Sequence, residues 1–513
     1  MASLPNHITV SGAPEGFDAR LMAEEAQTRG GGVLHVARDD KRMAAMAEAL
    51  RLTAPDLPVL SFPGWDCLPY DRVSPNPDVS AARMATLAAL APGLEGAFVV
   101  LTTLNAATQR VPERALLREA AFSATVGDRI DEAALRTFLV RMGFVQAPTV
   151  TEPGDYAIRG GIIDIFPPGE GGPVRLDLFG DVLDGARRFD PASQRTTDTL
   201  TRVDLAPVSE VILDEPSITR FRQSYRAEFG SAGTDDPLYE AVSAGRKHAG
   251  VEHWLGFFHE RLETLFDYLP GASVMLDDQV TPQRLSRWEA IEDQYDARIE
   301  ALKARSGHDT VYKPADPHLL YLDDAAWEGR VSDLRVLQLS ALPQATGPGV
   351  TDAGGRIGRD FAPERQQENI SLFGALADHI KAGRVEGQVV IASYSTGARE
   401  RLQALLEDQE IADAKLIDDF RDVPDGSGGL FLMIWALEHG FTGRGLTVIS
   451  EQDVLGDRLI RAPRRKRRAE NFLTEHQTLS PGDLIVHVDH GVGRYLGLKV
   501  VTALGAAHEC LLL

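Results

Sequence analysis

Two features are missing from this chain of 513 residues: a cysteine framework and a long apolar run. The two cysteines, Cys67 and Cys510, lie too far apart in sequence to suggest a disulfide framework, which fits a reducing cytosol. No stretch approaches the roughly 18 apolar residues of a membrane span, and residues 1–12 lack the pattern of a signal peptide. We therefore expect a cytoplasmic protein without a membrane partner.

Positive charge is also scarce. The chain has 53 Lys and Arg against 75 Asp and Glu, a net charge of −22, so any nucleic-acid contact must come from a local patch. The basic run at residues 461–468, RAPRRKRR, could contact phosphates or an acidic surface. Like charges in a row favour a solvated, flexible linker, and we prefer that interpretation.

A phosphate-binding lysine is missing as well. Short strands alternate with amphipathic helices over residues 7–110, and this order of elements predicts a parallel sheet. In a P-loop ATPase the loop after the first strand would lie at residues 11–18, which read SGAPEGFD. Phe17 stands at the position of the lysine and Asp18 at that of the magnesium-binding hydroxyl, and neither can replace it. We predict the fold of an ATPase without its chemistry, and no catalytic, cofactor-binding or metal residue; Asp277 is interpreted as part of a strand-end turn.

The stretch from Asp155 to Pro191 carries the clearest surface pattern. Residues 174–179, VRLDLF, alternate with period two, so one face of a strand is apolar and the other carries Arg175, Asp177 and Phe179. An aromatic ring beside opposite charges on the outer face of a strand is typical of a contact surface. The alternative is an ordinary domain in which the Arg and Asp merely pair. Two apolar runs flank the strand and predict a small antiparallel sheet: residues 156–166 and 182–189.

Three motifs in this stretch carry a resemblance: RGGIIDIFPPG, VRLDLFGD and RRFDP. They resemble the small inserted domain that UvrB shares with the transcription-repair coupling factor family, which binds the excinuclease subunit UvrA. The resemblance implies UvrA as a partner, with Arg159, Arg175, Asp177 and Phe179 at the contact. PGWDCLPYDRVSPNPD and SAARMATLAAL resemble the coupling factors rather than UvrB, whose first domain keeps an intact Walker motif.

A second resemblance lies near the end of the chain. LSPGDLIVHVDHGVGRYLGL resembles the RNA-polymerase-interacting domain of the same family, which is a small Tudor-like barrel. The resemblance implies that this barrel binds the polymerase β subunit through a sheet edge. By position, this implies Arg494, Tyr495 and Val501 as polymerase contacts; alternatively, HGVGRY is simply a tight hairpin bounded by glycines. The family continues with motor domains that bind ATP and magnesium and move along DNA. Because this chain has no such domains, we expect a fragment that uses no cofactor itself and that would reach damaged or upstream DNA only through the missing motor.

The expected fold class is a multidomain α/β chain. A degenerate RecA- or P-loop-like parallel-sheet domain carries an inserted UvrB-like α+β domain, and a second α/β domain and a truncated Tudor- or SH3-like β-barrel follow. Helices are predicted at residues 17–29, 39–52, 80–90, 132–142, 282–305, 364–381 and 396–407. The segments are residues 1–117 and 211–342 for the first domain, 118–210 for the inserted domain, 343–362 for a linker, 363–457 for the second α/β domain, 458–478 for a basic linker and 479–513 for the incomplete polymerase-interacting domain.

The function expected from these patterns is that of a scaffold in transcription-coupled nucleotide excision repair. The inserted domain would recruit UvrA, and the barrel would contact the RNA polymerase β subunit at a polymerase stalled by DNA damage. An alternative from another class is a UvrB-like ATPase that binds damaged DNA, which would need a nucleotide site at residues 11–18. A third interpretation is a stand-alone transcription regulator that uses only the barrel, which leaves the UvrB-like portion unexplained.

Overall fold

The computed structural model describes most of the chain and divides it into two compact units, Met1–Gly456 and Asp457–Leu513. Each unit is described by itself below. The described residues are 6–120, 122–169, 171–230, 236–304, 311–367, 369–456, 484–487, 491–494, 496–503 and 506–512.

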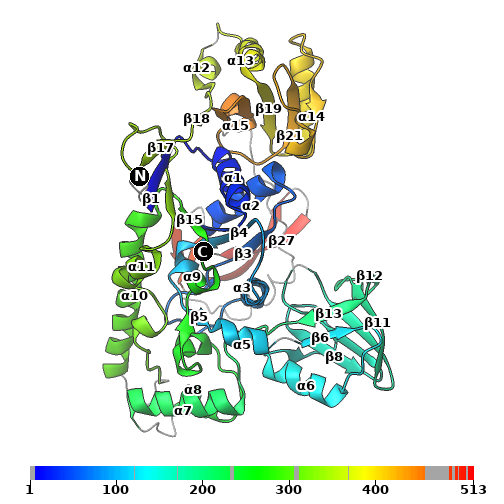
Figure 1. The fold of residues 1–513 in the computed structure, drawn as a ribbon, viewed down its shortest axis with the longest axis vertical. Helices are drawn as coiled ribbons and strands as arrows, with labels where there is room; N and C mark the ends of the chain where they lie inside the picture. Colours follow the sequence, from blue (N-terminus) through cyan, green and yellow to red (C-terminus); the bar gives the residue numbers. More distant parts are fainter. Residues whose placement is uncertain are drawn as a thin grey trace. The chain divides into compact units, whose positions relative to one another are not determined.

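A seven-stranded parallel sheet organises the first part of the larger unit (Figure 1). The prediction of a mixed α/β chain with a parallel sheet is therefore confirmed. Strands from both sides of the inserted segment contribute to this sheet, since β15 (Ser273–Leu276) pairs with β2 (Gly32–Ala37) and β16 (Val336–Leu339) pairs with β1 (His7–Ser11). In sheet order the strands are β17 (Val350–Asp352), β1 (His7–Ser11), β16 (Val336–Leu339), β15 (Ser273–Leu276), β2 (Gly32–Ala37), β4 (Phe98–Thr103) and β3 (Val59–Phe62).

Helices cover both faces of this sheet. Helices α1 (Phe17–Arg29) and α2 (Asp40–Thr53) pack in one hydrophobic core, and α3 (Pro77–Leu90), α9 (Leu265–Tyr268) and α11 (Asp324–Val331) pack in another. Residues 17–29 form a helix as predicted, and Asp39 caps α2 by accepting a hydrogen bond from the backbone N–H of Arg42. The other helices of the first domain are α4 (Leu104–Ala107), α5 (Arg114–Glu119), α7 (Glu215–Phe229), α8 (Pro237–Ser243) and α10 (Val280–Lys303), with short 3-10 turns η1 (Val251–Phe257) and η2 (Pro317–Leu319) and a two-strand pair, β5 (Val111–Pro112) with β14 (Leu262–Glu263).

The inserted segment forms a six-stranded sheet with α6 (Glu132–Arg141) against one face (Figure 1). Neighbouring strands of this sheet pair antiparallel, except that β7 (Val145–Gln146) pairs parallel with β8 (Asp155–Arg159). The predicted apolar run at residues 156–166 is two strands rather than one, because Gly160, with a positive φ of 61°, begins a tight turn. In sheet order the strands are β12 (Thr196–Leu200), β11 (Val182–Phe189), β10 (Val174–Phe179), β9 (Ile162–Ile165), β8 (Asp155–Arg159) and β7 (Val145–Gln146); β6 (Phe122–Thr125) and β13 (Arg202–Leu205) form a separate pair.

A second six-stranded sheet begins in the segment that composition marks as a linker. Residues 343–362 are structured, because β17 joins the first sheet and β18 joins this one. The single helix predicted at residues 364–381 is wrong: α12 ends at Gln366, and Ser371 caps a new helix, α13. The elements are β18 (Arg356–Ile357), α12 (Ala362–Gln366), α13 (Leu372–Glu386), β19 (Gln388–Ser393), α14 (Thr396–Glu407), β20 (Lys415–Leu416), η3 (Phe420–Asp422), β21 (Leu430–Ile434), β22 (Phe441–Gly443), β23 (Leu446–Ser450) and α15 (Glu451–Leu455).

The smaller unit contains four described strands. They form two antiparallel pairs, β24 (Leu484–His487) with β25 (Gly491–Arg494) and β26 (Gly497–Ala503) with β27 (Ala506–Leu512). A barrel built from these strands stays a prediction. The basic run at residues 461–468 lies outside the described residues. Among the described helices, none is long and apolar enough to cross a membrane.

Candidate functional site

The second face of the inserted sheet carries the side chains that the strand pattern predicts. Val174 and Leu176 are buried against α6, whereas the side chain of Phe179 is 82% exposed, so the predicted alternation of β10 is confirmed. The register places neighbouring residues of β8, β9 and β11 on the same face as Arg175 and Asp177. We call this surface the charged face; it comprises Arg159, Ile162, Asp164, Arg175, Asp177, Phe179 and Arg187.

Arg175 lies in the middle of the charged face and is engaged within the domain. Its guanidinium donates two hydrogen bonds to the carboxylate of Asp164, at 2.7 and 2.9 Å, and stands 4.8 Å from the ring centre of Phe189. Asp164 is 2% exposed, so this ion pair is largely buried on the acidic side. The hydrogen bonds that Arg175 donates to Asp164 raise the pKa of Arg175. Arg175 therefore fits the alternative interpretation, in which arginine and aspartate side chains merely pair with each other. Much of the hydrogen-bonding capacity of its guanidinium is already used within the domain.

The other predicted residues gather near the hairpin end of the face. Arg159 and Asp177 lie on either side of Ile162 in one row across the sheet, because both pair with that residue in register. Phe179 follows Asp177 by two residues and ends β10. Arg159 donates to the carbonyl oxygen of Pro148. The structure thus brings all four predicted contact residues to one face, with the exposed aromatic ring at its end.

Three residues of the charged face were missed by sequence reasoning. Ile162, 40% exposed, lies beside Asp177, and Arg187 forms an ion pair with the same aspartate. Asp164 faces Arg175 directly across β9 and β10. The alternation of IIDI in β9 could have placed Ile162 and Asp164 on one face. The sequence did not indicate Arg187, because a register shift in β11 interrupts the alternation of its side chains between the two faces of the sheet.

The loop at the expected nucleotide position is filled by Phe17 and by aromatic rings of the second α/β domain. Phe17, in place of the lysine, is fully buried 5.8 Å from the ring of Phe441 in the second α/β domain. A Cβ on Gly16 would lie 2.8 Å from that same ring, so the loop has no room for a phosphate. That residues 11–18 do not bind nucleotide stays a prediction.

Arg42 occupies the centre of the charge cluster beneath this loop. It forms ion pairs with Asp18 and, at 3.3 Å, with Asp277, and all three side chains are buried. Burial raises the pKa of Asp18 to about 6, although Arg42 lowers it. Burial would also raise the pKa of Asp277, but His35 and Arg42 outweigh it and hold that pKa at about 2. Asp277 directly follows the end of β15, as expected; its buried ion pairs were not indicated by the sequence.

None of the described histidines belongs to a metal site. Among the residues that the structure describes, no group of three or more His, Cys, Asp or Glu side chains could hold a metal ion. His35 lies 3.4 Å from Asp277, and His253 is buried between the rings of Trp65 and Tyr70. Both side chains are buried, as core residues are.

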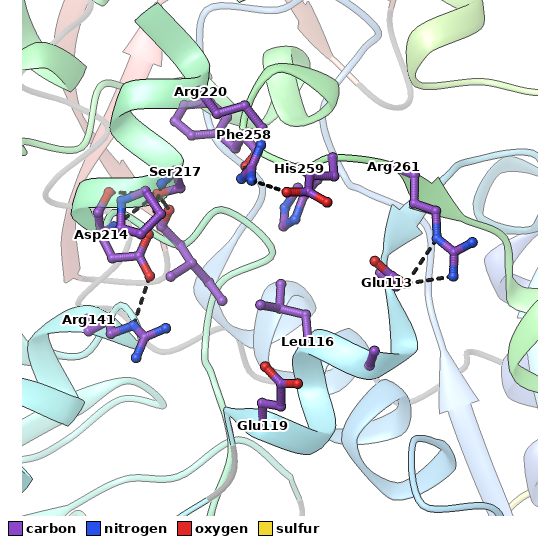
Figure 2. A pocket seen from close by; sticks show the side chains of 14 residues that line it. Glu113, Leu116, Glu119, Arg141, Asp214, Ser217, Arg220, Phe258, His259 and Arg261 are labelled. Atoms are coloured by element: carbon purple, nitrogen blue, oxygen red, sulfur yellow. Dashed lines mark hydrogen bonds and ion pairs between the residues drawn. The ribbon is translucent and has the colours of Figure 1, made fainter.

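A cavity of about 330 Å³ lies where the chain enters and leaves the inserted domain. It is bounded by α5, the end of α6, the start of α7 and residues 258–261. Most of its charged groups form ion pairs with one another. The three ion pairs that line it (Figure 2) are Arg141–Asp214, Arg220–Glu260 and Arg261–Glu113, with N–O distances of 2.9, 2.8 and 2.5 Å.

The predicted polymerase contacts fall in the smaller unit. Arg494 ends β25 with an exposed side chain, and Val501 lies in β26, paired in register with His508 of β27. Tyr495 lies outside the described residues. The strand pairing agrees with the hairpin expected for HGVGRY and does not test the three contacts.

Three family models match successive parts of the chain. The model described as UvrB interaction domain matches residues 122–210, which include the charged face. The model described as MFD, D3 domain matches residues 382–454, and the CarD-like/TRCF RID domain model matches residues 479–513.

Curated relatives match nearly the whole chain. A transcription-repair-coupling factor of Escherichia coli is 33% identical over 96% of this chain and 42% of its own length. This chain is the counterpart of the amino-terminal part of a transcription-repair-coupling factor. Factors of the same name from Haemophilus influenzae and Myxococcus xanthus are 29% and 30% identical over 99% and 89% of this chain, and over 44% and 39% of their own lengths. The chain thus spans less than half the length of these relatives, as the resemblance implied.

Proposed function

We propose that this chain serves transcription-coupled nucleotide excision repair as a recruiting scaffold. The inserted domain binds UvrA through the charged face, and residues 479–513 contact the β subunit of RNA polymerase. The observation that carries the proposal is the exposed ring of Phe179 beside paired charges, in a domain that matches the UvrB interaction domain. The site is proposed to work in the cytoplasm, with ATP, magnesium and DNA handled by parts of the coupling factors outside this chain.

Phe179 is the anchor in this proposal. A large ring that is almost fully exposed gains the most from burial in a partner pocket, because binding removes its apolar surface from water. Ile162 widens the apolar patch, and the Asp177–Arg187 pair forms a polar rim that orients the partner. Arg159 adds a second cation at the same end of the sheet.

Arg175 has a different role in the same surface. Its ion pair with Asp164 holds β9 and β10 together and fixes the backbone from which Asp177 and Phe179 project. We therefore assign Arg175 as a positioning residue with partial access to the partner. Loss of binding in an Arg175 variant would combine lost contact with a loosened sheet.

Two finer assignments complete the proposal. The first domain is a degenerate RecA-like fold, supported by its parallel sheet and by the blocked loop at residues 11–18. Residues 479–513 form part of a Tudor-like barrel that presents Arg494, Tyr495 and Val501 to the polymerase, supported by the match to the CarD-like/TRCF RID domain model.

The test is a titration of purified UvrA into the wild-type chain, Phe179→Ala and Val385→Ala, with ATP hydrolysis assayed in the same samples. Val385 is a matched control, because it is also 82% exposed but lies on α13 of the second α/β domain. We expect Phe179→Ala to weaken binding about tenfold or more, the usual effect of removing an aromatic anchor, and Val385→Ala to change nothing. A folded wild-type chain that does not bind UvrA, or equal affinities of the two variants, would refute the proposal.

A further inference from the structure

A polar cavity of about 300 Å³ lies between the first domain and the second α/β domain of the larger unit. Its walls come from α1, the end of α2, the segment after η3 and the turn between β22 and β23. Two arginines from different domains, Arg20 and Arg444, line it. Neither arginine belongs to the charged face or to the loop at residues 11–18.

Arg20 faces the cavity without a counter-ion in contact. Among the described residues, its guanidinium has no hydrogen bond or ion pair, although the side chain is partly buried. Burial lowers the pKa of Arg20, the charge of Glu24 opposes that effect, and the charge of Arg444 lowers the pKa further. A desolvated, unpaired cation beside a second cation is unfavourable until an anion joins them.

Arg444 is held beside Arg20 by an unusual backbone conformation. It has a positive φ of 50° in a two-residue hairpin turn, where its successor Gly445 also has a positive φ, of 73°. Such turns favour Asn or Gly at the first position, because a β-carbon is strained in this region. The Arg444 guanidinium pairs with Glu24 and lies 5.8 Å from the centre of the Phe17 ring. The strained residue thus places a cation at the cavity.

The rest of the lining limits what the anion can be. The side-chain amide of Gln388 is already bonded to the backbone of Pro424 and Gly429, and the hydroxyl of Thr53 donates to Ala49. Asp425 contributes an exposed carboxylate to the rim, and the preceding acidic residues belong to the same segment. These carboxylates repel a long polyanion such as nucleic acid, whereas a compact anion can reach the two guanidinium groups directly.

We propose that the cavity between Arg20 and Arg444 binds a small phosphorylated molecule. Two guanidinium groups from different domains suit the several oxygens of one phosphate group, which can accept hydrogen bonds from both. A volume of about 300 Å³ admits a phosphate with a modest organic substituent. Because the two arginines come from α1 and from the β22–β23 turn, the bound ligand also ties the two domains together.

The test uses inorganic pyrophosphate as the probe, with thermal unfolding and calorimetric titration of the whole chain at constant ionic strength. Pyrophosphate should raise the melting temperature of the wild-type chain, and Arg20→Gln should weaken binding about tenfold or more, as expected for a lost charge-assisted hydrogen bond. Arg444→Gly is the sharper variant: it removes the cation, and the relief of positive-φ strain offsets the loss of the exposed ion pair with Glu24. Binding should therefore fall while the unliganded protein keeps about the stability of the wild type. Arg29→Gln, on the exposed end of the same helix, is the matched control and should bind as the wild type does.

Three outcomes would overturn the proposal. Pyrophosphate could stabilise the wild type and Arg20→Gln equally, which would place its binding elsewhere. Chloride at the same ionic strength could give the same shift as pyrophosphate, which would indicate general screening. A short single-stranded oligonucleotide could bind in an Arg20-dependent way while pyrophosphate does not, which would make the site a nucleic-acid contact.

Discussion

The guanidinium of Arg175 is hydrogen-bonded at two points to Asp164, which is almost wholly buried, and the two residues face each other across β9 and β10. An arginine predicted as a surface contact is thus also the counter-ion of a buried carboxylate. An alanine substitution of Arg175 would therefore change two properties at once: the stability of the inserted domain and the affinity for a partner.

Arg175→Ala is expected to destabilise the inserted domain. It leaves the carboxylate of Asp164 buried without a cation, which should cost about 2–3 kcal/mol because Arg175 itself is partly solvated. Urea unfolding, followed by circular dichroism, measures the change. The double variant Arg175→Ala with Asp164→Ala should lose less than the sum of the single variants. Additive losses would show that the two residues do not interact in solution.

Phe17→Ala is expected to loosen the joint between the first domain and the second α/β domain. The ring is buried against Phe441, so its removal should cost about 3–5 kcal/mol. Trp435 lies 6.1 Å from Phe441, so its fluorescence should report the change during thermal unfolding. Phe17→Lys, which places a lysine at the P-loop position, should not create binding of a fluorescent ATP analogue, because Trp435 and Phe441 crowd the loop. Nucleotide binding by that variant would contradict the closed loop.

Arg42→Met is expected to be strongly destabilising near neutral pH. The variant leaves two buried carboxylates, Asp18 and Asp277, without their shared cation, at a cost of about 3–5 kcal/mol. In the wild type the pKa of Asp277 is about 2, so its stabilising effect is present above the normal carboxyl pKa of about 3.8 and is lost as the pH falls through 2. Without Arg42 that pKa rises, and the penalty should shrink between pH 7 and pH 4. Denaturant midpoints at the two pH values measure it, and a constant penalty would argue against this electrostatic origin.

His253 is expected to make the wild-type chain sensitive to mild acid. Burial lowers its pKa from 6.5 to about 4, so the unfolded state binds a proton more readily between those values. Stability is therefore complete above pH 6.5 and falls as the pH drops toward 4, by at most about 1.4 kcal/mol per pH unit. His253→Phe keeps a ring between Trp65 and Tyr70 but removes the titration. The variant should show a flatter stability profile from pH 7 to pH 5, and identical slopes would exclude His253 as the cause.

Local patterns were sufficient for many of the elements. The bounds of α1 and α14 and the two faces of β10 follow from helical and strand periodicity, which depend on near neighbours in sequence. The missing lysine at Phe17 was visible for the same reason, since a P-loop is a contiguous motif. The break between α12 and α13 was missed, because the cap at Ser371 is a weak signal by itself.

The sequence by itself determined where β10 lies, which of its side chains point outward and that the first loop lacks the lysine of a P-loop. Only the tertiary structure decided that Arg175 pairs with Asp164, that Arg42 pairs with both Asp18 and Asp277, and that Arg20 and Arg444 line one cavity. The reason is physical. Periodicity records whether a side chain faces the core or the solvent, but the partner of a charge is set by strand register and domain packing, which bring together residues hundreds of positions apart.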